Sequence, residues 1–235
     1  MQPSMTTHID IELKILRTDI IYMWNLVINQ LTKTRKAVEE FDKGLATEIA
    51  ATEKRIDAYE LKIDMDCENI LALFNPLANE LRFVLAVLKI NYNLERIGDF
   101  AWGIAKIIRD KDHPFSSEAV TKTQLLMLFD TSIEMLSEAL AAFESEDNQL
   151  ARSIFTKDAT LDEANRNAIG NITELIRQFP DDIQDHLNLL IVIRKLERAG
   201  DHTKNICEEI IFYLEAKILR HRKKGKNTDM PAAEQ

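Results

Sequence analysis

Apolar residues recur along this chain at the three- and four-residue spacing of an amphipathic helix. In the first half, this pattern predicts three helices, over residues 9–38, 45–74 and 77–109. The middle helix carries isoleucine at seven-residue intervals, at Ile49, Ile56, Ile63 and Ile70. Such a stripe is typical of a seam between packed helices.

The second half repeats this plan, with helices predicted over residues 118–143, 148–178 and 182–219. A polar stretch at residues 110–114, which ends in proline, separates the halves. Because short connections join antiparallel neighbours, each half is expected to pack as a three-helix bundle. The chain is therefore predicted to adopt an all-α fold of two tandem three-helix bundles.

The two bundles account for most of the chain, and we assign residues 5–112 to the first and 115–219 to the second. The remaining residues, 220–235, lose the helical periodicity and begin with a run rich in Lys and Arg. We expect them to form a basic, disordered and solvated tail. Contact between this tail and an anionic surface is the alternative.

The composition favours helices and restricts the classes of function. Six glycines and five prolines in 235 residues are too few for a turn-rich β protein. The net charge of −9 argues against nucleic-acid binding and is compatible with cation binding. Cys67 and Cys207 suggest no disulfide framework, no secretory leader opens the chain, and no apolar run approaches the ~20 residues of a membrane span. We expect a soluble, cytoplasmic protein.

One six-residue motif occurs twice. Leu-Glu-Arg-Ile-Gly-Asp at residues 94–99 returns as Leu-Glu-Arg-Ala-Gly-Asp at residues 196–201, 102 positions later. A repeat of this kind indicates an internal duplication. Each copy places two carboxylates four residues apart, and therefore on one face of a helix.

The hairpins predicted around Pro76 and Pro180 bring further acids level with the motifs. Glu53 and Asp57 precede Pro76 by as many residues as Asp99 and Glu95 follow it. The second hairpin repeats the arrangement around Pro180. Each hairpin is thus predicted to hold four carboxylates side by side: Glu53, Asp57, Glu95 and Asp99 in the first group, and Asp158, Asp162, Glu197 and Asp201 in the second.

Two interpretations of these groups remain open. The rotation of each acid around its helix, at ~100° per residue, places the groups on the outside of the bundles. They could be ordinary charged faces, helped by pairs such as Arg96 with Asp99. Alternatively they bind cations, because four level carboxylates need positive charge and all-oxygen ligands suit Mg²⁺, Mn²⁺ or iron. Further candidate ligands are Glu60, Asp64 and His202.

The motif residues resemble the signature of the PhoU family. Residues 196–202, followed by Asn205 and Ile206, are similar to the family pattern Glu-Arg-Ile-Gly-Asp-His-Ala-x-Asn-Ile, and residues 46–57 resemble the family's first repeat. The resemblance covers about residues 10–215. Three positions depart from the pattern: Phe100 replaces the usual His, Ala199 replaces Ile, and Gly103 stands where Asn is common.

This resemblance implies two similar three-helix bundles that bind metal clusters through the eight acids named above. Divalent or trivalent ions of iron, manganese, magnesium or zinc are the expected cofactors. It also implies a non-enzymatic, negative regulator of phosphate uptake and phosphate-starvation signalling. The implied partners are the ATPase subunit of a phosphate ABC transporter and a membrane sensor histidine kinase, met at the inner face of the membrane. A homodimer is expected.

Two other functions are weighed against this one. A metal-free helical scaffold or adaptor would need no ligands at the acidic positions. A carboxylate-bridged di-iron oxidase would need Glu-x-x-His pairs on inward faces, and no His in the chain lies three residues after a Glu.

Overall fold

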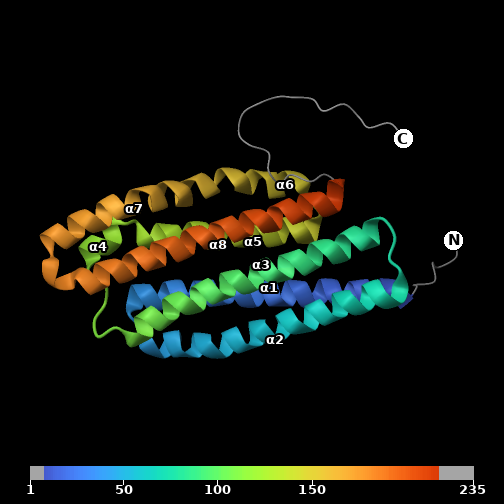
Figure 1. Cartoon of the computed structure of the whole chain (residues 1–235), viewed down its shortest axis with the longest axis horizontal. Coiled ribbons are helices and arrows are strands. Elements are labelled where there is room, and N and C mark those ends of the chain that lie inside the picture. The colour runs from blue at the N-terminus through green and yellow to red at the C-terminus, as the bar shows by residue number, and fades with distance from the viewer. Residues whose placement is uncertain (1–7, 217–235) are drawn as a thin grey trace, which may run out of the picture.

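A computed structural model describes residues 8–216, and its regular structure is entirely helical (Figure 1). The all-α class predicted from the hydrophobic pattern is confirmed. The helices, in chain order, are α1 (His8–Glu40), α2 (Lys43–Phe74), α3 (Asn79–Asp110), α4 (Ser117–Lys122), α5 (Leu125–Ser145), α6 (Asn148–Ser153), the 3₁₀ turn η1 (Ile154–Thr156), α7 (Asp158–Gln178), the 3₁₀ turn η2 (Pro180–Asp182) and α8 (Ile183–Glu215).

Local signals set the ends of the first three helices. The Asp42 side chain accepts a 2.8 Å hydrogen bond from the Leu45 amide and so caps the start of α2. Asn75 takes the left-handed conformation, with φ of 47°, at the end of that helix, directly before Pro76. These ends lie within two residues of the predicted ones.

The second half departs from the prediction at two places. The helix expected over residues 118–143 is divided into α4 and α5, because Gln124 adopts a left-handed φ of 54°. The helix expected over residues 148–178 is divided into α6, η1 and α7. Neither break contains a glycine or proline that would have predicted it from the sequence. The tail assigned to residues 220–235 lies outside the described residues.

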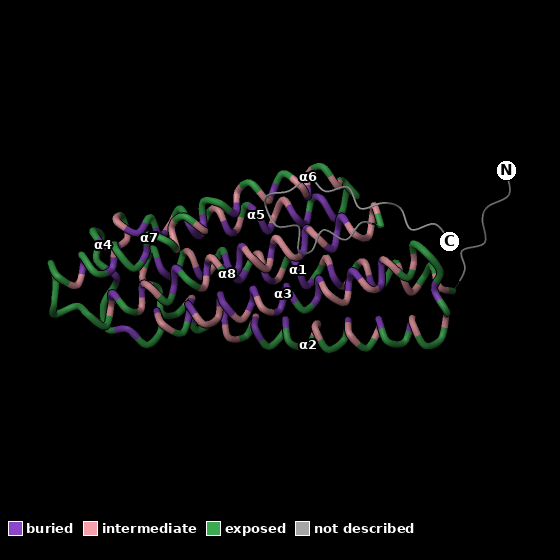
Figure 2. The backbone as a smooth tube through the Cα atoms, turned by 45° about the horizontal axis from the view of Figure 1, so that its top comes forward, coloured by how far each residue is buried: buried purple, intermediate pink, exposed green. Residues whose placement is uncertain are grey.

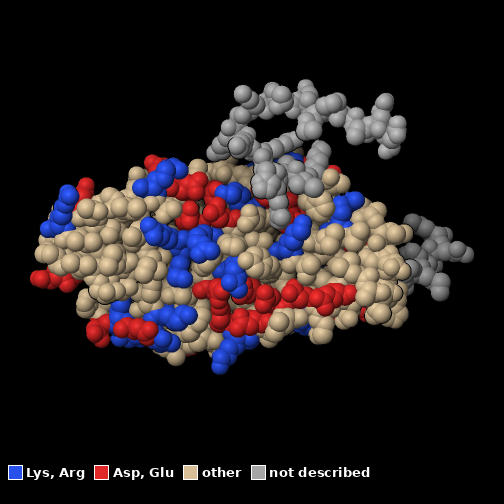
Figure 3. Space-filling model, in the orientation of Figure 1, with Lys and Arg blue, Asp and Glu red and all other residues tan. Residues whose placement is uncertain are grey.

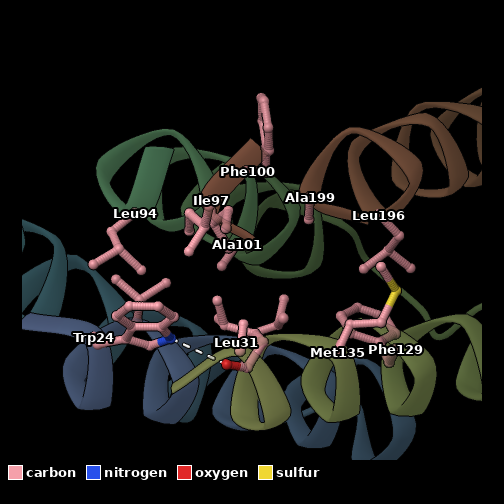
Figure 4. Packing of buried hydrophobic residues seen from close by; sticks show 14 of the residues in the cluster. Trp24, Leu31, Leu94, Ile97, Phe100, Ala101, Phe129, Met135, Leu196 and Ala199 are labelled. Atoms are coloured by element: carbon pink, nitrogen blue, oxygen red, sulfur yellow. Dashed lines mark hydrogen bonds between the residues drawn. The ribbon is translucent and has the colours of Figure 1, made fainter. Parts of the chain in front are cut away.

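The two bundles lie side by side and share one core. Helix α8 runs along α3, and α1 contacts α5, so elements of the two halves face each other along their length (Figures 1 and 2). Buried apolar residues from both halves form a single cluster. Trp24 of α1 illustrates this continuity, because its indole Nε1 donates a 3.1 Å hydrogen bond to the Leu136 carbonyl of α5 (Figure 4).

The repeated motif lies in the middle of this packing. Ile97 and Ala101 of α3, and Leu196 and Ala199 of α8, point into the shared core, whereas Phe100, which is also buried in the cluster, points in the opposite direction (Figure 4). The apolar positions of the motif therefore bind the two bundles together, and its acids are directed elsewhere. None of the described helices has the length and apolar character that a membrane span requires.

Candidate functional site

The first carboxylate group lies between α2 and α3. Glu53 and Asp99, which are equally far from Pro76 in sequence, lie close enough for their carboxyl groups to share a hydrogen bond. Asp57 lies near enough to Glu95 to raise the pKa of that carboxyl. The antiparallel hairpin thus brings together the acids that the sequence places level with one another.

A buried glutamine from a third helix supports this group. Gln30 of α1 is fully buried, and its Nε2 donates to Glu53 Oε2 at 2.6 Å and to the Gly98 carbonyl at 3.1 Å. A Cβ on Gly98 would lie 3.5 Å from Glu53 Oε2 and 3.3 Å from Ile56 Cδ1. The glycine of the motif therefore allows α2 and α3 to approach closely beside the carboxylates.

Arg96 lies at the solvent edge of the first group. Its guanidinium pairs with the adjacent Glu95 and lies 3.2 Å from Asp99, while its Cζ stacks 5.6 Å from the centre of the Tyr92 ring. Its side chain is 36% exposed. Arg96 contacts two of the four carboxylates, and Lys195 of α8 lies within electrostatic range of Asp99, so the group keeps an excess of negative charge.

The additional candidates Glu60 and Asp64 continue the acidic strip along α2. Burial raises the pKa of Glu60, and the negative charge of the nearby Glu95 raises it further. Asp64 Oδ1 instead accepts a 2.8 Å hydrogen bond from Asn91, whose amide also donates to the Glu60 carbonyl. Asp64 therefore contacts Asn91, and not one of the motif acids.

Burial and mutual repulsion make the two glutamates of the first group, Glu53 and Glu95, difficult to ionise. Burial, together with the nearby Asp99 and Asp57, raises the pKa of Glu53 to about 7, against the opposing effect of the hydrogen bond from Gln30. Burial also raises the pKa of Glu95, in opposition to Arg96. A bound cation would relieve both effects.

The second group lies between α7 and α8 and contains a lysine. Lys204 Nζ pairs with Asp158 and lies 2.8 Å from Asp201 Oδ1. Burial raises the pKa of Asp158, and this effect outweighs the opposing contact with Lys204. Burial likewise raises the pKa of Glu197, with contributions from Asp201 and Asp162. All four predicted acids therefore lie near one another.

Close packing surrounds the buried end of this group. A Cβ on Gly200 would clash with Leu161 Cδ1 and lie 3.3 Å from Asp158 Oδ1. Asp158 is 5% exposed, and its Oδ1 has no hydrogen-bond partner among the described residues. Gly200 thus plays the same part as Gly98 and lets the two helices meet beside a buried carboxylate.

The expected position of the acids on the outside of the bundles is only partly correct. Glu53, Glu95 and Asp158 are buried, whereas Asp57 is exposed and the other acids of the two groups are half-buried. Each group therefore extends from the surface into the packing between two helices. The rotation of side chains around a single helix does not predict this burial, because a neighbouring helix covers the inner end of each group.

His202 is directed toward the first bundle. Its Nδ1 lies 2.8 Å from Asn93 Oδ1 of α3, and its ring packs 5.4 Å from Phe100. Burial and the nearby Arg198 lower the pKa of this histidine. His202 therefore connects the two motif helices in this arrangement.

Two acidic patches lie on one face of the molecule, one over α2 and α3 and one over α7 and α8, with Lys and Arg between them (Figure 3). All-oxygen donors and excess negative charge fit a hard cation in the first group. Across residues 8–216, however, no three Asp, Glu, His or Cys side chains are arranged to hold one metal ion as they stand. The donor chemistry of the first group fits, while Lys204 already neutralises part of the second.

Sequence reasoning missed Gln30 and Lys204. Gln30 is a polar residue on the buried side of α1, and that position was a usable signal. Lys204 lies three residues after Asp201, a spacing at which helical side chains meet, so this contact was also open to prediction. Its contact with Asp158 depends on how α7 packs against α8.

Comparisons with known proteins agree with the duplicated helical plan. A family model described as the PhoU domain matches residues 20–108 and 125–210. The phosphate-specific transport system accessory protein PhoU of Edwardsiella tarda is 32% identical over 211 residues, covering 89% of this chain and 86% of that protein. The phosphate-specific transport system accessory protein PhoU homolog 1 of Thermotoga maritima is 29% identical over 231 residues, covering 97% of this chain and 97% of that protein.

Solved structures extend the likeness to three dimensions. The crystal structure of PhoU from Pseudomonas aeruginosa superposes with a TM-score of 0.84 at 30% identity, covering 88% of this chain and 99% of that one. The phosphate transport system regulatory protein PhoU from Streptococcus pneumoniae gives a TM-score of 0.78 at 28% identity, over 90% of this chain and 99% of that one. This chain therefore shares its fold with both solved proteins over most of their length.

Proposed function

Because this chain belongs to the PhoU family, we propose that it is a regulatory accessory protein of a phosphate-specific transport system. In this role it represses phosphate uptake and the phosphate-starvation response when phosphate is plentiful. One observation carries the proposal: the family model matches both halves, over the residues that supply both carboxylate groups. The protein acts through contacts with other proteins and not by catalysis.

The proposed partners are the ATPase subunit of a phosphate ABC transporter and a membrane sensor histidine kinase. The names of the relatives connect them with the transport system and so support the first partner. The protein would meet both partners from the cytoplasm, at the inner face of the membrane. A homodimer is part of the same proposal, and light scattering of the purified protein tests it.

Metal binding at the carboxylate groups is the finer part of the proposal. Glu53, Asp99 and their neighbours would hold a divalent or trivalent ion of iron, manganese, magnesium or zinc. The raised pKa values of Glu53 and Glu95 support this, because a cation stabilises the ionised form of both carboxylates. When bound, the metal would supply positive charge and join α2 to α3.

A gene deletion tests the regulatory role. Deleting the gene is expected to raise expression from a phosphate-starvation promoter in phosphate-rich medium, and the wild-type gene supplied in trans should restore repression. Unchanged expression in the deletion strain would contradict the role.

Elemental analysis of protein purified without chelator tests metal binding separately. Equal metal in wild type and in a double variant, Asp99→Ala with Asp201→Ala, would favour a metal-free scaffold.

A further inference from the structure

The two carboxylate groups differ in what neutralises them. In the second group, Lys204 Nζ lies between Asp158 and Asp201 and contacts both carboxylates. Asp158 belongs to α7 and Asp201 to α8, so one ammonium group joins the two helices. The lysine side chain is 29% exposed, and the Asp158 side chain is 7% exposed. This cation therefore bridges the buried Asp158 and the more exposed Asp201.

The first group has no equivalent of this lysine. The position 102 residues earlier is Trp102. Lys106 Nζ lies 5.1 Å and Arg109 Cζ lies 5.5 Å from the centre of its ring. Glu53 makes no ion pair among the described residues, and its polar contacts are Gln30 and Asp99. Arg96 contacts Glu95 and Asp99 at the surface, and Lys195 lies within electrostatic range of Asp99 without forming an ion pair with it.

The packing around the second group also leaves little room for another cation. Leu161 fills the space beside Gly200, and Asp158 Oδ1 lies 3.3 Å from the position of a Cβ there. An ion entering between Asp158 and Asp201 would have to displace the ammonium group. The displaced Lys204 would then lose two charge-assisted hydrogen bonds.

We infer that Lys204 is the resident cation of the second carboxylate group, so that metal ions bind the first group and are excluded from the second. The inference rests on the proposed metal binding and divides it between two unequal sites. The duplication would then have produced one metal-responsive hairpin, α2–α3, and one hairpin, α7–α8, that is closed by its own side chain.

Titration with Mn²⁺, followed by electron paramagnetic resonance of the free ion, tests this division in the full-length protein. Relative to wild type, Asp99→Asn is expected to weaken Mn²⁺ binding at least about tenfold. Asp201→Asn is expected to weaken it by less than about twofold. Lys204→Met, which removes the ammonium but keeps an unbranched side chain of similar length, should create additional Mn²⁺ binding. Adding Asp201→Asn to Lys204→Met should abolish that gain.

Several results would overturn the inference or the proposal beneath it. If Asp201→Asn weakens wild-type binding as much as Asp99→Asn does, both groups bind metal and the inference is wrong. If the wild type binds no Mn²⁺, metal binding at the first group fails, while a gain in Lys204→Met would still support the role of the lysine. If Lys204→Met gains no Mn²⁺ binding, that role of Lys204 is overturned.

Two controls accompany these measurements. Lys36→Met on α1 controls for the loss of a surface charge. Circular dichroism and a second variant, Lys204→Gln, control for misfolding.

Discussion

His202 Nδ1 lies 2.8 Å from Asn93 Oδ1, and this contact joins one motif helix to the other. Phe100 and Lys195 occupy the positions equivalent to His202 and Asn93 in the other copy of the repeat. They also meet, with Lys195 Nζ 5.7 Å from the centre of the Phe100 ring. The duplicated interface is thus symmetric in backbone position and asymmetric in chemistry.

The stability of the protein should fall as the pH drops below about 6.5, in part because of His202. Burial lowers the pKa of His202 in the folded state below its usual 6.5, so the unfolded chain binds the proton more readily. The stabilising contribution of neutral His202 is therefore present above pH 6.5 and is lost as the pH falls toward the folded-state pKa. Urea unfolding of wild type and His202→Gln between pH 5 and 8 measures the effect. An equal pH dependence in both proteins would contradict it.

Glu53 should produce the opposite dependence in protein stripped of metal. Its pKa is about 7 in the folded state and 4.5 in the reference state, so the folded protein keeps the proton over this interval. Stability is expected to fall by about 2 kcal/mol as the pH rises from 4.5 to 7. Glu53→Gln should remove this slope, whereas Glu68→Gln, an exposed change on the same helix, should keep it. Denaturation in the presence of chelator provides the measurement.

Alanine at three glycines should give three different effects on stability. At Gly170, where nothing lies within 4 Å of a Cβ, alanine should stabilise the helix by about 1 kcal/mol. At Gly98 the contact with Ile56 should offset that gain and leave the free energy of unfolding within about 1 kcal/mol of wild type. At Gly200 the clash with Leu161 should destabilise the protein by about 1–3 kcal/mol. Thermal unfolding ranks the three, and a Gly200→Ala protein as stable as Gly170→Ala would refute the close approach of α7 and α8.

Trp24→Phe should lower the free energy of unfolding by about 1–3 kcal/mol. The change removes a buried hydrogen bond to Leu136 and part of a fully buried ring. Trp102→Phe is the matched control, because Trp102 is only half-buried and its ring lies beneath surface cations. Urea unfolding followed by circular dichroism compares the two, and equal losses would argue against the special role of Trp24 between the bundles.

The hairpins were predictable because proline and helical periodicity are local signals. Counting residues from Pro76 was enough to bring Glu53 level with Asp99, and the two carboxyl groups do meet. The break at Gln124 was not predictable, because a left-handed glutamine carries no signature in the sequence. The burial of Glu95 and Asp158 depends on neighbouring helices, which the periodicity of one helix does not describe.

The shared core gives the duplication a physical meaning. Trp24 bonds across to α5, and the motif residues Ile97 and Ala199 lie in the same apolar cluster. Either half alone would expose to water the face that its sister copy now covers. The two copies are therefore a covalent pseudo-dimer whose subunit interface is part of one continuous hydrophobic core, so a change in the packing of one copy acts directly on the other.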